Sequence, residues 1–194
     1  MVRAVSSRLW AAAVLAGALA AAPASAQAIS EASRRIVISG DAPSACVIAS
    51  PTAEQGTNAS FSSQSAAAGQ ITITQLVDPV SSTPLGSALA IDLPVICNTA
   101  HVLTVRSSNG ALTRPGAAAG PASGGFSATL PYRVSVDWGG QSLSRQSDAG
   151  TAQIALASAM QGTARVAFAT TPGGAPLVAG QYTDALIVEL APTN

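Results

Sequence analysis

Lysine is missing from this chain of 194 residues, and all nine of its basic side chains are arginines. Charged residues amount to 9% of the sequence, and the formal net charge at pH 7 is zero. Nucleic-acid binding depends on basic side chains that neutralise phosphates, and this chain has few of them. Intrinsic disorder is also excluded, because 48% of the residues are hydrophobic and the charges cancel. The composition therefore indicates a folded domain that does not bind nucleic acid.

Side chains that carry catalysis are equally scarce. The chain has one histidine, His101, and two cysteines, so nucleophile arrangements built on Ser-His, Cys-His or lysine lack their parts. His101 stands at the start of an apolar run, a position typical of a histidine at a strand edge or in a loop. The nine carboxylates are scattered, and Asp137 or Asp184 would pair only with a partner that folding brings close. The sequence predicts a protein that is not an enzyme and holds no cofactor or metal.

Long apolar runs are absent after the first residues, and those first residues have the parts of a secretory signal peptide. Arg3 and Arg8 make the start basic, residues 11–20 are apolar, and Ala24-Ser25-Ala26 is a small-x-small cleavage site. We expect cleavage after Ala26, which leaves an exported chain of residues 27–194. No later stretch approaches the roughly 20 apolar residues of a membrane span.

The two cysteines, Cys46 and Cys97, are an even number in a chain expected to be exported, which predicts one disulfide. The alternative is a reactive or metal-binding thiol pair. It is disfavoured because the spacing is not CxxC and His101 is the only further soft ligand.

Short runs rich in valine, isoleucine, threonine and aromatic residues recur after residue 26, separated by glycine, proline, serine and asparagine. We expect strands at residues 35–39, 45–50, 70–77, 88–97, 102–107, 127–138, 151–157, 164–170 and 182–190. This number and spacing of strands is typical of an all-β sandwich or barrel.

Two runs alternate between apolar and polar residues, as expected for a strand with one buried face and one solvent-exposed face. Ile71 and Ile73 share one face of the first run. The second run places four large residues on one face: Tyr132, Val134, Val136 and Trp138. Pro94 interrupts the run at residues 88–97, which predicts an edge position or a bulge there. Residues 114–125 are turn-forming and have little to bury, so we expect a surface loop.

Four motifs taken in order resemble the spore coat protein U domain family, which is similar to the subunits of archaic chaperone-usher pili. The first two are Ala42-Pro-Ser-Ala-Cys46-Val-Ile and Pro94-Val-Ile-Cys97. The third is Leu130-Pro-Tyr-Arg-Val134 followed by Trp138-Gly, and the fourth is Ala179-Gly-Gln-Tyr-Thr-Asp-Ala-Leu-Ile-Val188. The resemblance covers nearly all of residues 27–194.

The resemblance implies an immunoglobulin-like, pilin-type β-sandwich at residues 41–194 that lacks its last strand and carries one disulfide. A periplasmic pilus chaperone would first fill the open groove, and the N-terminal extension of a neighbouring pilus subunit would then replace it at an outer-membrane usher. The implied function is a structural subunit of a fimbrium, located in the periplasm and then at the cell surface, with a role in adhesion or biofilm formation. The alternative is a stand-alone periplasmic or surface binding module of the same fold.

The resemblance also suggests which residues make the junction between subunits. The donor strand would come from residues 27–40 in one of two registers. Its apolar residues would be Ala28, Ile36 and Ile38 in one register, or Ile29 and Val37 in the other. The groove wall would be the last strand, with four side chains on one face: Tyr182, Leu186, Val188 and Leu190. Two features depart from the family pattern. Residues 36–39 are alternatively part of the subunit's own first strand, and residues 58–77 are long enough for an extra hairpin.

Overall fold

The structure is a computed structural model that describes residues 33–65, 67–116 and 123–193. The chain divides after Gly40 into two units, Met1–Gly40 and Asp41–Asn194, and the described strands all belong to the second. The expected signal peptide at residues 1–26, with Ala28 and Ile29, lies outside the described residues. In the part of the chain that is described, no helix has the length and apolar character to cross a membrane.

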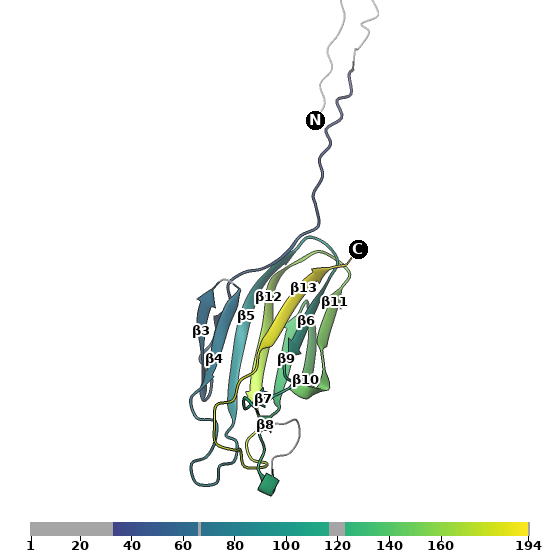
Figure 1. The fold of residues 1–194 in the computed structure, drawn as a ribbon. Coiled ribbons are helices and arrows are strands. Elements are labelled where there is room, and N and C mark those ends of the chain that lie inside the picture. Colours follow the sequence, from purple (N-terminus) through teal and green to yellow (C-terminus); the bar gives the residue numbers. More distant parts are fainter. Residues whose placement is uncertain (1–32, 66, 117–122, 194) are drawn as a thin grey trace, which may run out of the picture. The chain divides into compact units, whose positions relative to one another are not determined.

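The larger sheet is antiparallel and has the order β1–β5–β12–β9–β10, with β2 also paired to β5 (Figure 1). Its strands are β1 (Cys46–Ile48), β2 (Thr52–Ala53), β5 (Ser87–Cys97), β9 (Tyr132–Trp138), β10 (Gln141–Gln146) and β12 (Met160–Thr170). The two longest strands, β5 and β12, pair along their whole length from Met160 opposite Cys97 to Thr170 opposite Ser87. They form the rigid centre of this sheet.

The smaller sheet has the order β11–β6–β13 and contains β6 (His101–Ser107), β11 (Ala152–Leu156) and β13 (Leu186–Pro192). A separate hairpin is made by β3 (Ala59–Ser65) and β4 (Ala68–Ile73), and a short pair by β7 (Leu112–Thr113) and β8 (Thr129–Leu130). Two short 3-10 turns, Ser123–Gly125 and Ser147–Ala149, complete the described elements.

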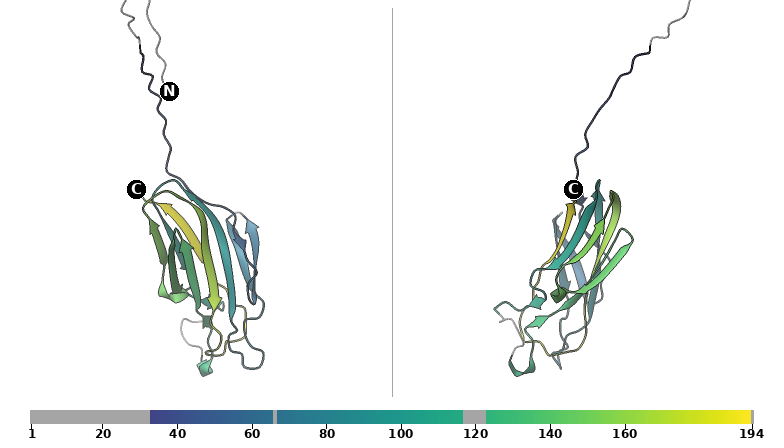
Figure 2. Two further views of the ribbon diagram at one scale, coloured as in Figure 1. Left: turned by 180° about the vertical axis from the view of Figure 1, so that it is seen from behind. Right: turned by 90° about the vertical axis from the view of Figure 1, so that its right-hand side faces the viewer.

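Buried side chains of both sheets form one core between two layers of strands (Figure 2). The larger sheet contributes Leu93, Val95, Val134, Val136, Trp138 and Val166, and the smaller sheet Leu103, Val105 and Ile154. Burial alternates along β9, so the predicted inward face from Tyr132 to Trp138 is confirmed. The expectation of an all-β fold is confirmed, because the described elements are strands and two short 3-10 turns.

The predicted disulfide is present and joins Cys46 to Cys97, which lie directly opposite each other in β1 and β5. It fixes a three-residue edge strand to the end of β5, one of the two longest strands of the sheet.

Pro94 does not lie on an edge strand, but the expected bulge is present on one side of β5. Ile48 pairs with Val95 and Thr52 pairs with Asp92, so the register of the β1 and β2 side shifts by one residue opposite Pro94. β5 is paired on both sides, and its register with β12 continues through Pro94 without a shift. The carbonyl of Pro94 accepts a 2.8 Å hydrogen bond from Ala49 N, so its backbone points toward the β1 and β2 side of the strand. Pro94 is tolerated because its missing N–H faces the break between β1 and β2.

The predictions for three other segments have different outcomes, which depend on whether a segment has a strand to pair with. Residues 35–39 are not a strand, although Ile36, Val37 and Ile38 favour extended backbone, because propensity without a pairing partner does not make one. The extra hairpin expected within residues 58–77 is confirmed as β3–β4. The last strand begins at Leu186 instead of Tyr182, and Thr183 before it forms an isolated bridge with Thr113.

Candidate functional site

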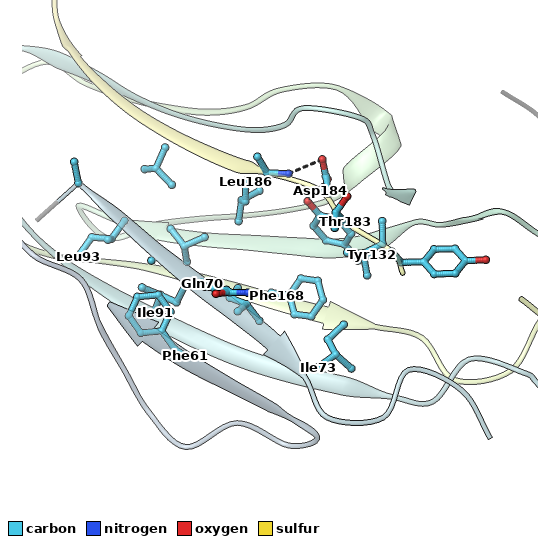
Figure 3. Close-up of a pocket in the computed structure, with 18 of the residues that line it drawn as sticks. Phe61, Gln70, Ile73, Ile91, Leu93, Tyr132, Phe168, Thr183, Asp184 and Leu186 are labelled. Carbon is cyan, nitrogen blue, oxygen red and sulfur yellow. Dashed lines mark hydrogen bonds between the residues drawn. The ribbon is translucent and has the colours of Figure 1, made fainter. Parts of the chain in front are cut away.

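An apolar cavity of about 570 Å³ lies between the start of β13 and the β3–β4 hairpin (Figure 3). Asp184 and Leu186 lie on one side of it, and Phe61 and Ile73 lie on the opposite side. Core side chains of the larger sheet line it as well: Ile91, Leu93, Tyr132, Val166 and Phe168. The cavity is thus an opening in the side of the core that none of the described strands covers.

The backbone of β13 has one unpaired edge. The strand pairs with β6 alone among the described strands. Ser108 N donates to Ala185 O at 2.9 Å and Thr193 N donates to Ala100 O at 2.8 Å, so odd-numbered residues point their peptide groups at β6. Peptide groups of an antiparallel pair alternate in direction. The N–H and C=O groups of Leu186, Val188 and Leu190 therefore face away from β6, along the free edge.

The predicted groove-wall residues lie on or near this cavity. Tyr182, Leu186 and Val188 line it, whereas Leu190 packs against the core beyond the lining. The hydroxyl of Tyr182 donates to backbone carbonyls of Ser127 and Val178, at 3.0 and 2.8 Å. Burial raises the pKa of this hydroxyl, so Tyr182 keeps its proton and holds the loop before β13 in place.

The opposite wall is the β3–β4 hairpin, and its inward residues include one that sequence patterns missed. Ile71 and Ile73 line the cavity from the predicted apolar face of β4. Phe61 lines it from β3, with its ring so close to Gly69 that a Cβ there would lie 2.3 Å from the ring. Gly69 is therefore required for this position of Phe61. The only signal in the sequence was a single aromatic residue among the polar residues of β3.

Hydrogen bonds to Asp184 define the polar end of the cavity. Its Oδ2 accepts from the hydroxyls of Tyr132, at 2.6 Å, and Ser107. Its Oδ1 accepts from the backbone N–H of Asn109 at 3.0 Å and of Ala185 at 2.8 Å. Burial and then the neighbouring carboxylate raise the pKa of Tyr132. Asp184 thus connects the start of β13 to Tyr132 of the larger sheet and Ser107 of the smaller sheet. Folding brings these partners close to it, as the sequence predicts for any partner of Asp184.

His101 has a structural environment different from the one expected. It begins β6 between β11 and β13 and is 0% exposed, so the expectation of an edge or loop histidine is wrong. Its Nε2 accepts from the indole N–H of Trp138 at 3.0 Å, which places the proton on Nδ1, where it donates to Thr99 O at 2.8 Å. Both ring nitrogens of His101 are therefore hydrogen-bonded within the fold. Among the described residues, no group of three or more His, Cys, Asp or Glu side chains is placed to hold a metal ion.

The expected donor residues that are described have no secondary structure. The side chains of Ile36, Val37 and Ile38 are 80%, 76% and 92% exposed. Three consecutive exposed aliphatic residues are unusual for a folded chain, because each leaves apolar surface in water.

Comparison of the chain with protein-family models, with curated proteins and with solved structures found no match.

Proposed function

We propose that this protein is an exported structural subunit of a chaperone-usher fibre, and that its fold is an immunoglobulin-like sandwich completed by a strand from another chain. The observation that carries this proposal is the apolar cavity beside the unpaired edge of β13. The intramolecular disulfide fits an oxidising compartment, as the N-terminal sequence does.

A cavity of this kind is a liability in an isolated chain. An unpaired strand edge beside apolar surface is a template for aggregation unless something covers it. An added β-strand would supply main-chain hydrogen bonds to Leu186, Val188 and Leu190 and would place alternate side chains in the cavity. A periplasmic chaperone would cover the groove first, and a neighbouring subunit would do so in the fibre.

The donor in this proposal is the segment at residues 27–40. Ile36, Val37 and Ile38 are its described apolar residues, and their exposure leaves them available to a partner. Burial of such side chains stabilises a junction by about 1.5 to 3 kcal/mol each when it is complete.

Deletion of residues 27–40 tests the proposal. The full chain should assemble into oligomers that sedimentation velocity resolves and electron microscopy displays as fibres, whereas the deletion variant should stay monomeric. A synthetic peptide of residues 33–40, added at about 100 times its Kd, should raise the unfolding free energy of the deletion variant by about 2.7 kcal/mol. A peptide of the same composition in scrambled order is the control. Should the deletion variant assemble as the full chain does, the stand-alone binding module becomes the better account.

A further inference from the structure

We propose that the groove takes residues 33–40 of a second copy of this chain, running antiparallel to β13 with Ile36 opposite Val188. This inference rests on the proposed function and adds the partner, the strand direction and the register. In this register the residue numbers of facing pairs add up to 224. The sequence of each strand and the extent of the cavity decide between this register and its neighbours.

The cavity accepts two inward side chains along β13. It is lined by Leu186 and Val188, and its lining ends before Leu190. Ile36 and Ile38 share one face of an extended strand, because side chains alternate. Placing them opposite Val188 and Leu186 puts two isoleucine side chains into the cavity.

The residues that flank these isoleucines also fit. Arg34 falls opposite Leu190, beyond the lining, so its guanidinium stays outside the cavity. Gly40 falls opposite Asp184, whose oxygens already accept four hydrogen bonds. A glycine has no side chain to disturb them.

The outward face of the same pairing is complementary in charge and polarity. Val37 falls opposite the half-buried Ile187, and Arg35 falls opposite Glu189. Glu189 has one cationic neighbour among the described residues, Arg106 at 3.5 Å, and its side chain is 56% exposed. Its carboxylate is free to accept a second arginine, and such cross-strand pairs of opposite charge favour one register over others.

Shifted registers lose these matches. A shift of two residues in one direction places Arg34 opposite Val188, inside the apolar cavity, and Ile38 opposite the Asp184 carboxylate. The opposite shift places Val37 beside Glu189 and leaves Arg35 facing Ala191. A shift of one residue turns Ile36 and Ile38 away from the core.

A parallel strand would also put Ile36 and Ile38 into the cavity, beside Leu186 and Val188. It would then place Arg34 beside Asp184. With four hydrogen bonds already accepted, that carboxylate has no oxygen position left for a guanidinium. The arginine would lose water without gaining full hydrogen bonding, which is costly at a partly buried site. The antiparallel direction avoids this cost.

Disulfide trapping between full-length chains tests the register. Arg35 and Glu189 form a non-hydrogen-bonded pair in the proposed junction, in which facing side chains approach most closely. One chain carries Arg35→Cys and the other carries Glu189→Cys, with the native Cys46–Cys97 bond intact in both. After mixing in a glutathione buffer, mass spectrometry of proteolytic peptides should find the mixed disulfide about tenfold more often than in any shifted pairing, since disulfide geometry is narrow.

Three further cysteine variants of the acceptor, the chain that supplies β13, test the alternative directions and registers of the donor strand. A dominant disulfide between Arg35→Cys and Ala185→Cys would establish the parallel strand, and one with Ile187→Cys or Ala191→Cys would establish a shifted register. Each result would overturn the inference while leaving the proposed function intact. If none of the acceptors reacts and deletion of residues 27–40 leaves assembly unchanged, the proposed function fails as well.

The identity of the donor copy has its own control. A chain with both Arg35→Cys and Glu189→Cys should, when diluted, remain a monomer with free thiols. An internal disulfide that forms independently of concentration would show that the segment fills its own groove, and the second copy would be excluded.

Discussion

Tyr132 combines two roles at the scale of single residues. Its ring packs against Phe168 with the ring centroids 4.9 Å apart, and its hydroxyl donates to Asp184. The ring therefore forms part of the cavity floor while the hydroxyl anchors the start of β13. Burial makes the ionised form of Tyr132 costly, and the adjacent carboxylate adds to that cost.

The raised pKa of Tyr132 predicts a loss of stability at high pH. Its ordinary pKa is 10.0, so above that pH the unfolded chain releases a proton that the folded chain retains. The unfolded state then binds fewer protons, and the free energy of unfolding falls as pH rises, by at most about 1.4 kcal/mol per pH unit for this group. Urea titrations between about pH 8 and about pH 12 should show this slope.

Two variants separate Tyr132 from the other tyrosine. Tyr132→Phe should remove most of the alkaline slope, whereas Tyr182→Phe should remove a smaller part, because the pKa of Tyr182 is raised less by its surroundings. An unchanged slope in Tyr132→Phe would assign the effect to other groups.

Sequence patterns could identify the inward residues of single strands but not the contacts between strands. The alternation from Tyr132 to Trp138 sufficed to predict which side chains are buried. The hydrogen bond between His101 and Trp138 joins residues 37 apart in the sequence. The Asp184 cluster likewise depends on pairing between distant segments. Neither has a local pattern, so both were beyond prediction from one sequence.

At the scale of elements, strands with a clear apolar pattern were predictable, including the edge strand β11, whereas two edge strands without such a pattern, β3 and β10, were not. β5 and β6 are rich in apolar residues because both are paired on two sides and face the core. β10 lies at the end of its sheet and half-buries only two of its residues, Leu143 and Gln146, so its sequence carries no clear apolar period. β3 is similar, with Phe61 as its single large apolar residue. Strands such as these two are specified by their neighbours more than by their own sequence.

The open edge of β13 makes Val188→Asp an informative variant. Val188 lines the cavity and packs against the core, so an aspartate there would put a carboxylate among apolar side chains. We expect a loss of about 2 kcal/mol in unfolding free energy and at least about a tenfold weaker binding of a peptide of residues 33–40. Isothermal titration calorimetry measures the binding.

Ala191→Asp is the matched control for that variant. Ala191 is on the same strand but is exposed and outside the cavity lining. The added charge is the same, so this variant should bind the peptide nearly as the unmodified chain does. If both variants bind the peptide equally well, the edge of β13 is not the groove wall.

At the scale of the whole molecule, no local sequence pattern reports which edge of β13 is paired. The cavity is open beside β13 because this strand has one neighbour, β6, among the described strands, and that pairing is a property of the assembled sheets. The composition could predict a folded all-β domain, and the two cysteines could predict its disulfide. The position of the cavity could not be predicted, because its lining residues come from β3, β4 and β13, which lie far apart in the sequence.

The disulfide should act on the whole chain although it holds a short strand. In the folded protein Cys46–Cys97 fixes only β1 to the end of β5. In the unfolded chain it closes a loop across a sequence separation of 51 residues, which restricts the unfolded ensemble. The double variant Cys46→Ser/Cys97→Ser should therefore lose about 4 kcal/mol of unfolding free energy. Its urea m value should rise, because an uncrosslinked chain exposes more surface on unfolding. If hydrogen exchange instead shows only β1 amides weakened, with the global free energy and m value unchanged, the bond stabilises the folded strand alone.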